Sequence, residues 1–247
     1  MKILKLIGLV VLLGCIFLTA NTSAQEVTAQ KSETNISASD LQTRKKTTIL
    51  NRLEKDGLIL TEVKKLRKDK QDDVVCLALN IYHEARGSTE EDQIASSYVV
   101  FNRYEDNGYP LTLGRNERSI CNIVFDRWQF CWTNNDVIPL PKEKGAWKKA
   151  QTLAMELYTN PKHKELAKKF ALQHYVVTPL VTQNGRPKWI DKRTMTVEIG
   201  AHSYMSLKAN IDATLQKNES SKAIHQAYGI IFGKRDLQEN ITIKKLQ

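Results

Sequence analysis

The chain has 247 residues, with 37 Lys or Arg against 27 Asp or Glu, so its formal net charge is +10. This charge favours an anionic partner such as nucleic acid, a membrane surface or an acidic polymer. The sequence contains neither a zinc-finger spacing nor an RNA-binding motif of aromatic and basic residues, so we expect no nucleic-acid partner.

The first 24 residues have the pattern of a secretory signal peptide. Lysines precede an apolar run over residues 6–18, which is short for a membrane span, and Thr22-Ser23-Ala24 offers small residues for cleavage. The segment ending at Cys15 also resembles a lipoprotein processing site, and an uncleaved anchor is a third alternative. All three alternatives predict an exported protein, either periplasmic or extracellular.

Residues 25–72 are predicted to form a linker followed by charged helices. Residues 25–40 are polar and poor in large apolar side chains, which is typical of a linker. Residues 41–72 are rich in charge, with apolar residues at roughly helical intervals from Ile49 onward. We expect one or two amphipathic helices broken near Gly57, which either pack on the following domain or lie on an external surface.

The compact domain is expected to begin near residue 72 with two consecutive helices. The first contains a buried apolar run and ends at Gly87, a residue that commonly terminates helices. The second opens on a capping box, with Ser88 as N-cap and Glu91 three residues later, and continues through residues 94–103.

The rest of the domain is predicted to contain further helices and then strands. The apolar spacing indicates helices over 119–126 and 142–159, and strands over 174–178 and 196–204. Gly200 marks a bulge or a close approach within the second strand. The pattern assigns no element after residue 208.

Three cysteines follow the signal-like segment. Cys76 lies in the apolar helix and is expected to be a small core residue. Cys121 and Cys131 are ten positions apart across a turn-rich segment, and in an oxidising compartment they could form a disulfide. Spacing alone does not establish the geometry, so this pairing is a hypothesis. The cysteines do not indicate a metal site.

Glu84 is the residue that most directly suggests chemistry. It shares a helix face with Asn80, one turn earlier, and lies near the negative end of the helix dipole. Desolvation and the dipole both disfavour its charged form and raise its pKa. A carboxylic acid that stays protonated near neutral pH can act as a general acid. The alternative is a surface residue or half of an ion pair, for example with Arg86.

The segment Ala78–Gly87, which contains Glu84, resembles the signature of the spore cortex-lytic, germination-type cell wall hydrolases. Further segments resemble other motifs of this family, in the family's order: Gln93–Arg103, Tyr109-Pro110 with Ser119–Phe125, Trp128–Trp132, and Pro187–Trp189 with Ile199–Tyr204. The likeness covers about residues 73–206. Cys131 departs from it, since the family commonly has Ser there.

The resemblance implies an α+β, mainly helical catalytic domain with a small β-sheet, related in shape to lysozymes and lytic transglycosylases. It implies a peptidoglycan-degrading enzyme, which we expect to be a monomer without cofactor or metal. The expected organisation is a signal peptide (1–24), a charged segment (25–72), the catalytic domain (73–207) and a C-terminal extension (208–247). The charged segment and the net positive charge would hold the enzyme to anionic wall polymers or a membrane surface.

The resemblance also implies that Glu84 is the catalytic acid, acting on the bond between N-acetylmuramic acid (MurNAc) and N-acetylglucosamine (GlcNAc). A hydrolase of the muramidase type needs a second carboxylate. No second carboxylate stands out, and the candidates near motif positions are Asp126, Glu198, Glu90 and Glu91. Because the sequence offers no clear second carboxylate, it favours a lytic transglycosylase, in which Glu84 serves as acid and then as base.

Asn80, Gln129, Trp132, His202 and Tyr204 are the expected substrate-binding residues. Trp132 would present its ring to a sugar and Gln129 would bond an acetamido group, whereas Phe130 belongs in the core. His202 and Tyr204 alternate along a strand and therefore point to the same side. The alternative is that the rings fill the core and His202 is a structural residue.

Two other classes of function remain open. In a metal-dependent amidase, His83, Glu84, His174 and His202 would be the ligands, but the sequence lacks the paired histidines of a zinc helix. In a non-catalytic wall-binding protein, replacing Glu84 by Gln would change nothing.

Overall fold

The computed structural model describes residues 37–107, 109, 111, 118–171, 176–179, 195–205 and 213–232. Its elements, in chain order, are α1 (Ala38–Lys55), α2 (Thr61–Lys64), α3 (Lys68–Asn80), the π-helical turn η1 (Ile81–Ala85), α4 (Glu90–Glu105), α5 (Ile120–Val124), the 3-10 turn η2 (Cys131–Asn134), α6 (Lys144–Thr159), α7 (Pro161–Ala171), β1 (Val176–Pro179), β2 (Met195–Ile199), β3 (His202–Met205) and α8 (Ala213–Phe232). The predicted α+β, mainly helical class with a small sheet is confirmed. The signal-like residues 1–24, with Cys15, lie outside the described residues.

The charged segment before residue 72 packs on the rest of the fold. In α1, Ile49 and Leu53 are buried in the common core. Arg52 donates a hydrogen bond to the carbonyl oxygen of Ile138 at 3.0 Å, which ties α1 to a loop far along the chain. Gly57, at φ +65°, separates α1 from α2, close to the expected break. The described residues on both sides of the expected boundary between residues 72 and 73 fall in one compact unit.

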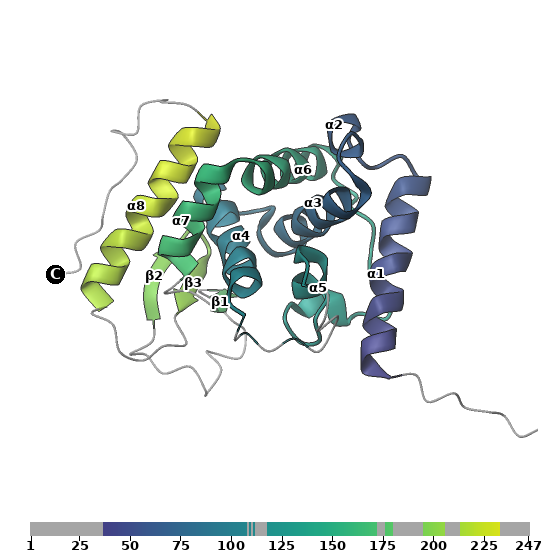
Figure 1. Cartoon of the computed structure of the whole chain (residues 1–247), viewed down its shortest axis with the longest axis horizontal. Coiled ribbons are helices and arrows are strands. Elements are labelled where there is room, and N and C mark those ends of the chain that lie inside the picture. The colour runs from purple at the N-terminus through teal and green to yellow at the C-terminus, as the bar shows by residue number, and fades with distance from the viewer. Residues whose placement is uncertain are drawn as a thin grey trace, which may run out of the picture. The chain divides into compact units, whose positions relative to one another are not determined.

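The central helices are α3, α5 and α6, with α3 packed between the other two (Figure 1). Helix α3 begins at Lys68, one turn before the expected start. A disulfide joins Cys76 of α3 to Cys121 of α5, and Cys131 is a free, exposed cysteine. The expected Cys121–Cys131 bond is therefore wrong, because the packing of α3 on α5 brings Cys76 to the position that a partner of Cys121 must occupy.

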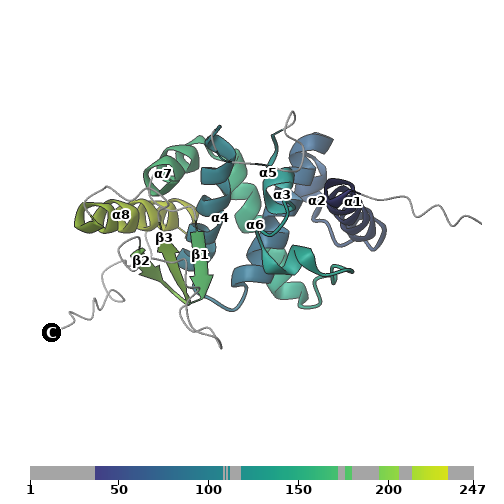
Figure 2. The same ribbon diagram turned by 90° about the horizontal axis from the view of Figure 1, so that it is seen from below.

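The sheet lies beside α4, α7 and α8 (Figure 2). Its strand order is β1-β3-β2, and both pairings are antiparallel. The single strand expected over residues 196–204 is instead a hairpin, because Gly200 adopts φ +57° and turns the chain between β2 and β3. Such a positive φ favours glycine over residues with a Cβ.

Two long helices that the pattern did not predict complete this side of the fold. Helix α7 starts at Pro161, immediately after the single residue that follows α6, and proline suits the first turn of a helix. Helix α8 lies within the region expected to be a C-terminal extension, yet it packs on α4, α7 and β2. Its Ala223, Ile224 and Ala227 belong to the common core. No helix within the described part of the chain is both long and apolar enough to cross a membrane.

Candidate active site

Glu84 lies in η1, where the helix that begins as α3 widens into a π-helical turn. Short π-helical turns within helices occur frequently at functional sites. The Glu84 side chain is half-buried and forms no hydrogen bond with another described side chain. Burial raises the pKa of Glu84, whereas the positive charges of His202 and Arg103 act in the opposite direction. Desolvation wins, so the carboxyl group keeps its proton to a higher pH than an ordinary glutamate does, as the sequence predicts.

Asp92, in the first turn of α4, is the centre of a buried hydrogen-bond network beside this turn. Thr89 and not Ser88 is the N-cap of α4, accepting a hydrogen bond from the Asp92 backbone N–H at 3.3 Å. The Asp92 side chain is fully buried. It accepts hydrogen bonds from His202 Nδ1 at 2.7 Å and from the Tyr204 hydroxyl at 2.5 Å. The Ser88 hydroxyl also donates to it. Sequence reasoning missed Asp92, because an acid in the first turn of a helix is usually exposed and serves the helix dipole.

The network fixes the charges of its members. Burial opposes ionisation of Asp92, but hydrogen bonds from His202, Ser88 and Tyr204 hold its pKa below the ordinary value. Burial likewise opposes the charge on His202, but the Asp92 hydrogen bond and the charges of Asp92 and Glu84 raise the pKa of the imidazole. The arrangement therefore favours a carboxylate on Asp92 and a proton on His202. His202 lies close enough to Glu84 for the charges of these two side chains to interact.

Asn80, His83 and Trp132 form a second cluster around η1. The ring of Trp132 stacks on His83, with centroids 4.6 Å apart, and its Nε1–H donates to Asn80 Oδ1 at 3.3 Å. Burial, with a smaller contribution from Arg86, lowers the pKa of His83 to about 4, so this imidazole is neutral. Asn80 Nδ2 and His83 Nε2 are buried and have no hydrogen-bond partner among the described residues. Within the described part of the chain, these two atoms are the unpartnered buried side-chain polar atoms nearest in sequence to Glu84.

The two tryptophans of this segment differ in exposure. Trp132 is only 7 % exposed and one of its faces is covered by His83, so it is not the open sugar platform that we expected. Trp128 is 69 % exposed and adopts φ 64°, a backbone conformation that bulky residues rarely hold. Outliers of this kind concentrate at functional sites. The Arg127 guanidinium lies 5.0 Å from the Trp128 ring centroid.

Gln129 is connected to Glu84 through two intervening residues. The Tyr109 hydroxyl donates to Gln129 Oε1 at 2.5 Å. The guanidinium of Arg103 lies over the Tyr109 ring at 5.5 Å and over the Phe130 ring at 5.0 Å. Phe130 is buried, as predicted. Arg103, which sequence reasoning did not select, is the cation that connects this group electrostatically to Glu84.

The second-carboxylate candidates do not form a pair with Glu84. Glu90 is bound to Lys149 at 2.6 Å, and Asp126 is buried where its charge acts on Arg103. Glu91 is half-buried and Glu198 is exposed. The charged neighbours that shift the pKa of Glu84 are His202 and Arg103, both of which carry positive charge when protonated.

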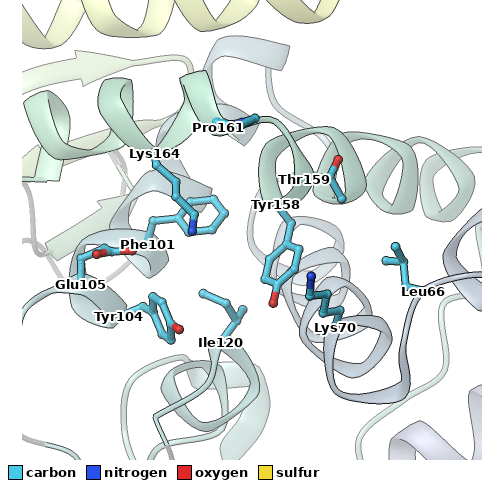
Figure 3. A pocket seen from close by; sticks show the side chains of 10 residues that line it. All are labelled: Leu66, Lys70, Phe101, Tyr104, Glu105, Ile120, Tyr158, Thr159, Pro161 and Lys164. Atoms are coloured by element: carbon cyan, nitrogen blue, oxygen red, sulfur yellow. The ribbon is translucent and has the colours of Figure 1, made fainter.

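The described residues contain no group of three or more His, Cys, Asp or Glu side chains arranged to hold a metal ion. His174, one of the ligands considered for a metal site, lies outside them. A pocket of about 320 Å³ opens elsewhere, and Glu84 does not line it. Figure 3 shows its aromatic wall of Phe101, Tyr104 and Tyr158 with the amines of Lys70 and Lys164.

Residues 87–205 match the sequence pattern of the cell wall hydrolase family. The chain carries a cell wall hydrolase domain. This enzyme therefore belongs to a class that acts on peptidoglycan. The matched region contains Asp92, Gln129, Trp132, His202 and Tyr204, but it begins at Gly87, just after Glu84. Comparisons with curated proteins and with solved structures find no match.

Proposed function

We propose that this cell wall hydrolase cleaves the glycan strand of peptidoglycan between MurNAc and GlcNAc as a lytic transglycosylase. Glu84 is the general acid and then the base. One observation carries the proposal: a half-buried carboxyl group has a raised pKa, and the charged groups that act on it within the described part of the chain are His202 and Arg103, neither of which is a carboxylate. A raised pKa suits a general acid at neutral pH.

The reaction needs no partner carboxylate and no water. The protonated carboxyl of Glu84 gives its proton to the glycosidic oxygen, and the bond from that oxygen to C1 of MurNAc breaks. The 6-hydroxyl oxygen of the same MurNAc attacks C1, and its proton passes to the Glu84 carboxylate. The products are a 1,6-anhydro-MurNAc end and a GlcNAc with a free hydroxyl, and Glu84 is again protonated.

Several side chains are suited to hold the sugar during these steps. The Asn80 Nδ2 and His83 Nε2 atoms have no protein partner among the described residues, so each can bond a substrate group. The Gln129 amide is half-buried beside Tyr109. Trp128 replaces Trp132 as the proposed platform for a pyranose ring, because its ring is open to solvent. Hydrogen bonds to Asp92 hold His202 and Tyr204 in position.

The enzyme is proposed to work outside the cytoplasm, as the signal-like residues 1–24 indicate. The lysine-rich chain, with its net charge of +10, suits a surface of anionic wall polymers.

Digestion of purified peptidoglycan, followed by mass analysis of the released fragments, tests the proposal. We expect fragments with 1,6-anhydro-MurNAc ends. Cleavage should continue in the presence of a strong chelator, because the proposed reaction requires no metal ion. Reducing MurNAc ends would instead favour hydrolysis with a second carboxylate. A loss of cleavage on chelation would favour the metal-dependent amidase.

The variant Glu84→Gln keeps the size of the side chain but removes the proton that the mechanism transfers, and we expect it to be inactive while remaining folded. Glu143→Gln is the matched control. Glu143 is an exposed glutamate near η1 that pairs with Arg86 at 2.9 Å, and its loss should leave the products unchanged. Normal cleavage by Glu84→Gln would refute the proposed function and favour a wall-binding protein or another catalyst.

A further inference from the structure

Asp92 connects two parts of the site that lie far apart in the sequence. It is in the first turn of α4, whereas Ala201, His202 and Tyr204 belong to the β2–β3 hairpin, more than a hundred residues later. The carboxylate accepts hydrogen bonds from the Ala201 backbone N–H at 3.0 Å, from His202 Nδ1 and from the Tyr204 hydroxyl. One buried side chain therefore anchors a backbone group and two side chains of the hairpin.

The turn of the hairpin is shaped to fit this carboxylate. A Cβ placed on Gly200 would lie 2.6 Å from Asp92 Oδ2 and 2.6 Å from the Ser88 hydroxyl oxygen. The hairpin can therefore approach this closely only because residue 200 has no side chain. The close approach and the number of donors show that the position of the hairpin is set at Asp92.

The imidazole of His202 connects this anchor to the catalytic acid. Its Nδ1 edge is occupied by Asp92, which leaves Nε2 as the remaining polar atom of the ring. The titratable and charged groups that act on His202 are Asp92 from α4 and Glu84 from η1. Those that act on Glu84 are His202 from β3 and Arg103 from α4, and Glu84 in turn acts on the Tyr204 hydroxyl.

We propose that Asp92 is a positioning residue for the reaction and that it fixes His202 in its protonated form beside Glu84. His202 then stabilises the carboxylate that is left when Glu84 gives up its proton. This inference rests on the proposed role of Glu84. Before the transfer Glu84 is neutral and His202 gains little from it. As the proton leaves, negative charge develops on Glu84 and the neighbouring imidazolium stabilises it. An interaction that strengthens as the charge develops lowers the barrier rather than merely tightening binding.

The variant Asp92→Asn tests the proposal because it keeps the shape of the side chain and removes its charge. We expect kcat on purified peptidoglycan to fall by about 100-fold, with little change in the apparent KM, which is the lower end of the effect of losing one preorganised electrostatic contact in the transition state. His202→Gln should show a similar loss. Combining both changes should cost little more than either one alone, since Asp92 acts through His202.

The pH profile separates positioning from a merely structural role. The charge on His202 lowers the pKa of Glu84, so losing that charge should raise the Glu84 pKa further. Activity requires protonated Glu84, so the high-pH limb of the profile should move to higher pH in both variants. Asp73→Asn is the matched control, because Asp73 is also a buried helix aspartate but accepts its hydrogen bonds from the Cys121 backbone and Tyr158. This control should leave the limb where it is.

An unshifted high-pH limb and unchanged kcat in folded Asp92→Asn would overturn the proposal. If Asp92→Asn does not fold, His202→Gln decides alone, since it keeps Asp92 bonded to Tyr204 and Ala201, and an unshifted limb there overturns the proposal as well. Glu84→Gln distinguishes this failure from failure of the proposed function. If Glu84→Gln is inactive and the other variants keep the wild-type profile, only the positioning role is wrong. If Glu84→Gln stays active, the proposed function itself fails.

Discussion

The disulfide between Cys76 and Cys121 makes a quantitative prediction about stability. The two cysteines are 45 positions apart in the sequence, and closing a loop of that length in the unfolded chain corresponds to about 4 kcal/mol in the chain-entropy model. For a domain of this size, each kcal/mol shifts the melting temperature by roughly 2–4 °C. We therefore expect the variant Cys76→Ala/Cys121→Ala to melt roughly 8–16 °C below the wild type when both are measured by calorimetry under oxidising conditions.

Cys131→Ala is the control for this prediction, because Cys131 is exposed and free. It should melt at the wild-type temperature, and a reducing agent should lower the melting temperature of the wild type and of this control equally. Peptide mapping of the oxidised protein should recover a Cys76–Cys121 linked pair. A linked Cys121–Cys131 pair, or a double variant that melts with the wild type, would refute the reasoning.

The tryptophan, the hairpin turn and the buried aspartate give three further predictions. Trp128→Ala should raise the apparent KM for peptidoglycan several-fold in initial-rate assays without lowering the melting temperature. Phe130→Ala should instead lower the free energy of unfolding by about 3–5 kcal/mol, because its ring is buried. Equal KM values in wild type and Trp128→Ala would count against the proposed role of Trp128 as a sugar platform. Gly200→Ala should lose more than about 1 kcal/mol in chemical denaturation, since its φ and the nearby Asp92 both oppose a Cβ; a midpoint equal to that of the wild type would contradict this. Folding lowers the pKa of Asp92, so the stability that the Asp92 carboxylate contributes is present above its ordinary pKa and is lost as the pH falls through the folded-state pKa. The acid-induced fall in melting temperature should therefore be smaller in Asp92→Asn than in the wild type. Identical acid profiles would contradict the lowered pKa of Asp92.

The sequence supports those parts of the fold that depend on local periodicity. The apolar run before Glu84 and the small residues of α4 predict two adjacent buried helices, and both are present. The raised pKa of Glu84 is also predictable, because a carboxyl group that follows a buried run is desolvated. The cap of α4 was misplaced by one residue, since Ser88 and Thr89 both have a hydroxyl that can cap a helix.

The parts that could not be predicted depend on contacts between distant segments. Nothing local distinguishes Trp128 from Trp132, and which ring is buried is decided by His83 and Phe125 on other elements. The partner of Cys121 depends on how α5 packs against α3. The role of Asp92 becomes visible only when a hairpin more than a hundred residues later reaches it.

The π-helical turn η1 makes the position of the proposed catalytic acid a matter of chain length as well as residue type. A π-helical turn accommodates about one residue more than an α-helical turn. Removing one residue within η1 would restore a regular α-helical turn and leave the residues after it facing nearly the same way. Removing one residue from the regular part of α3 would instead rotate every following side chain by about 100° about the helix axis. Glu84 would then face another side of the helix, although its identity and neighbours in sequence were unchanged. In evolution, a single codon deletion in α3 could therefore switch the acid out of the site, whereas one within η1 could be absorbed by the π-helical turn, a difference that a comparison of residue types alone would overlook.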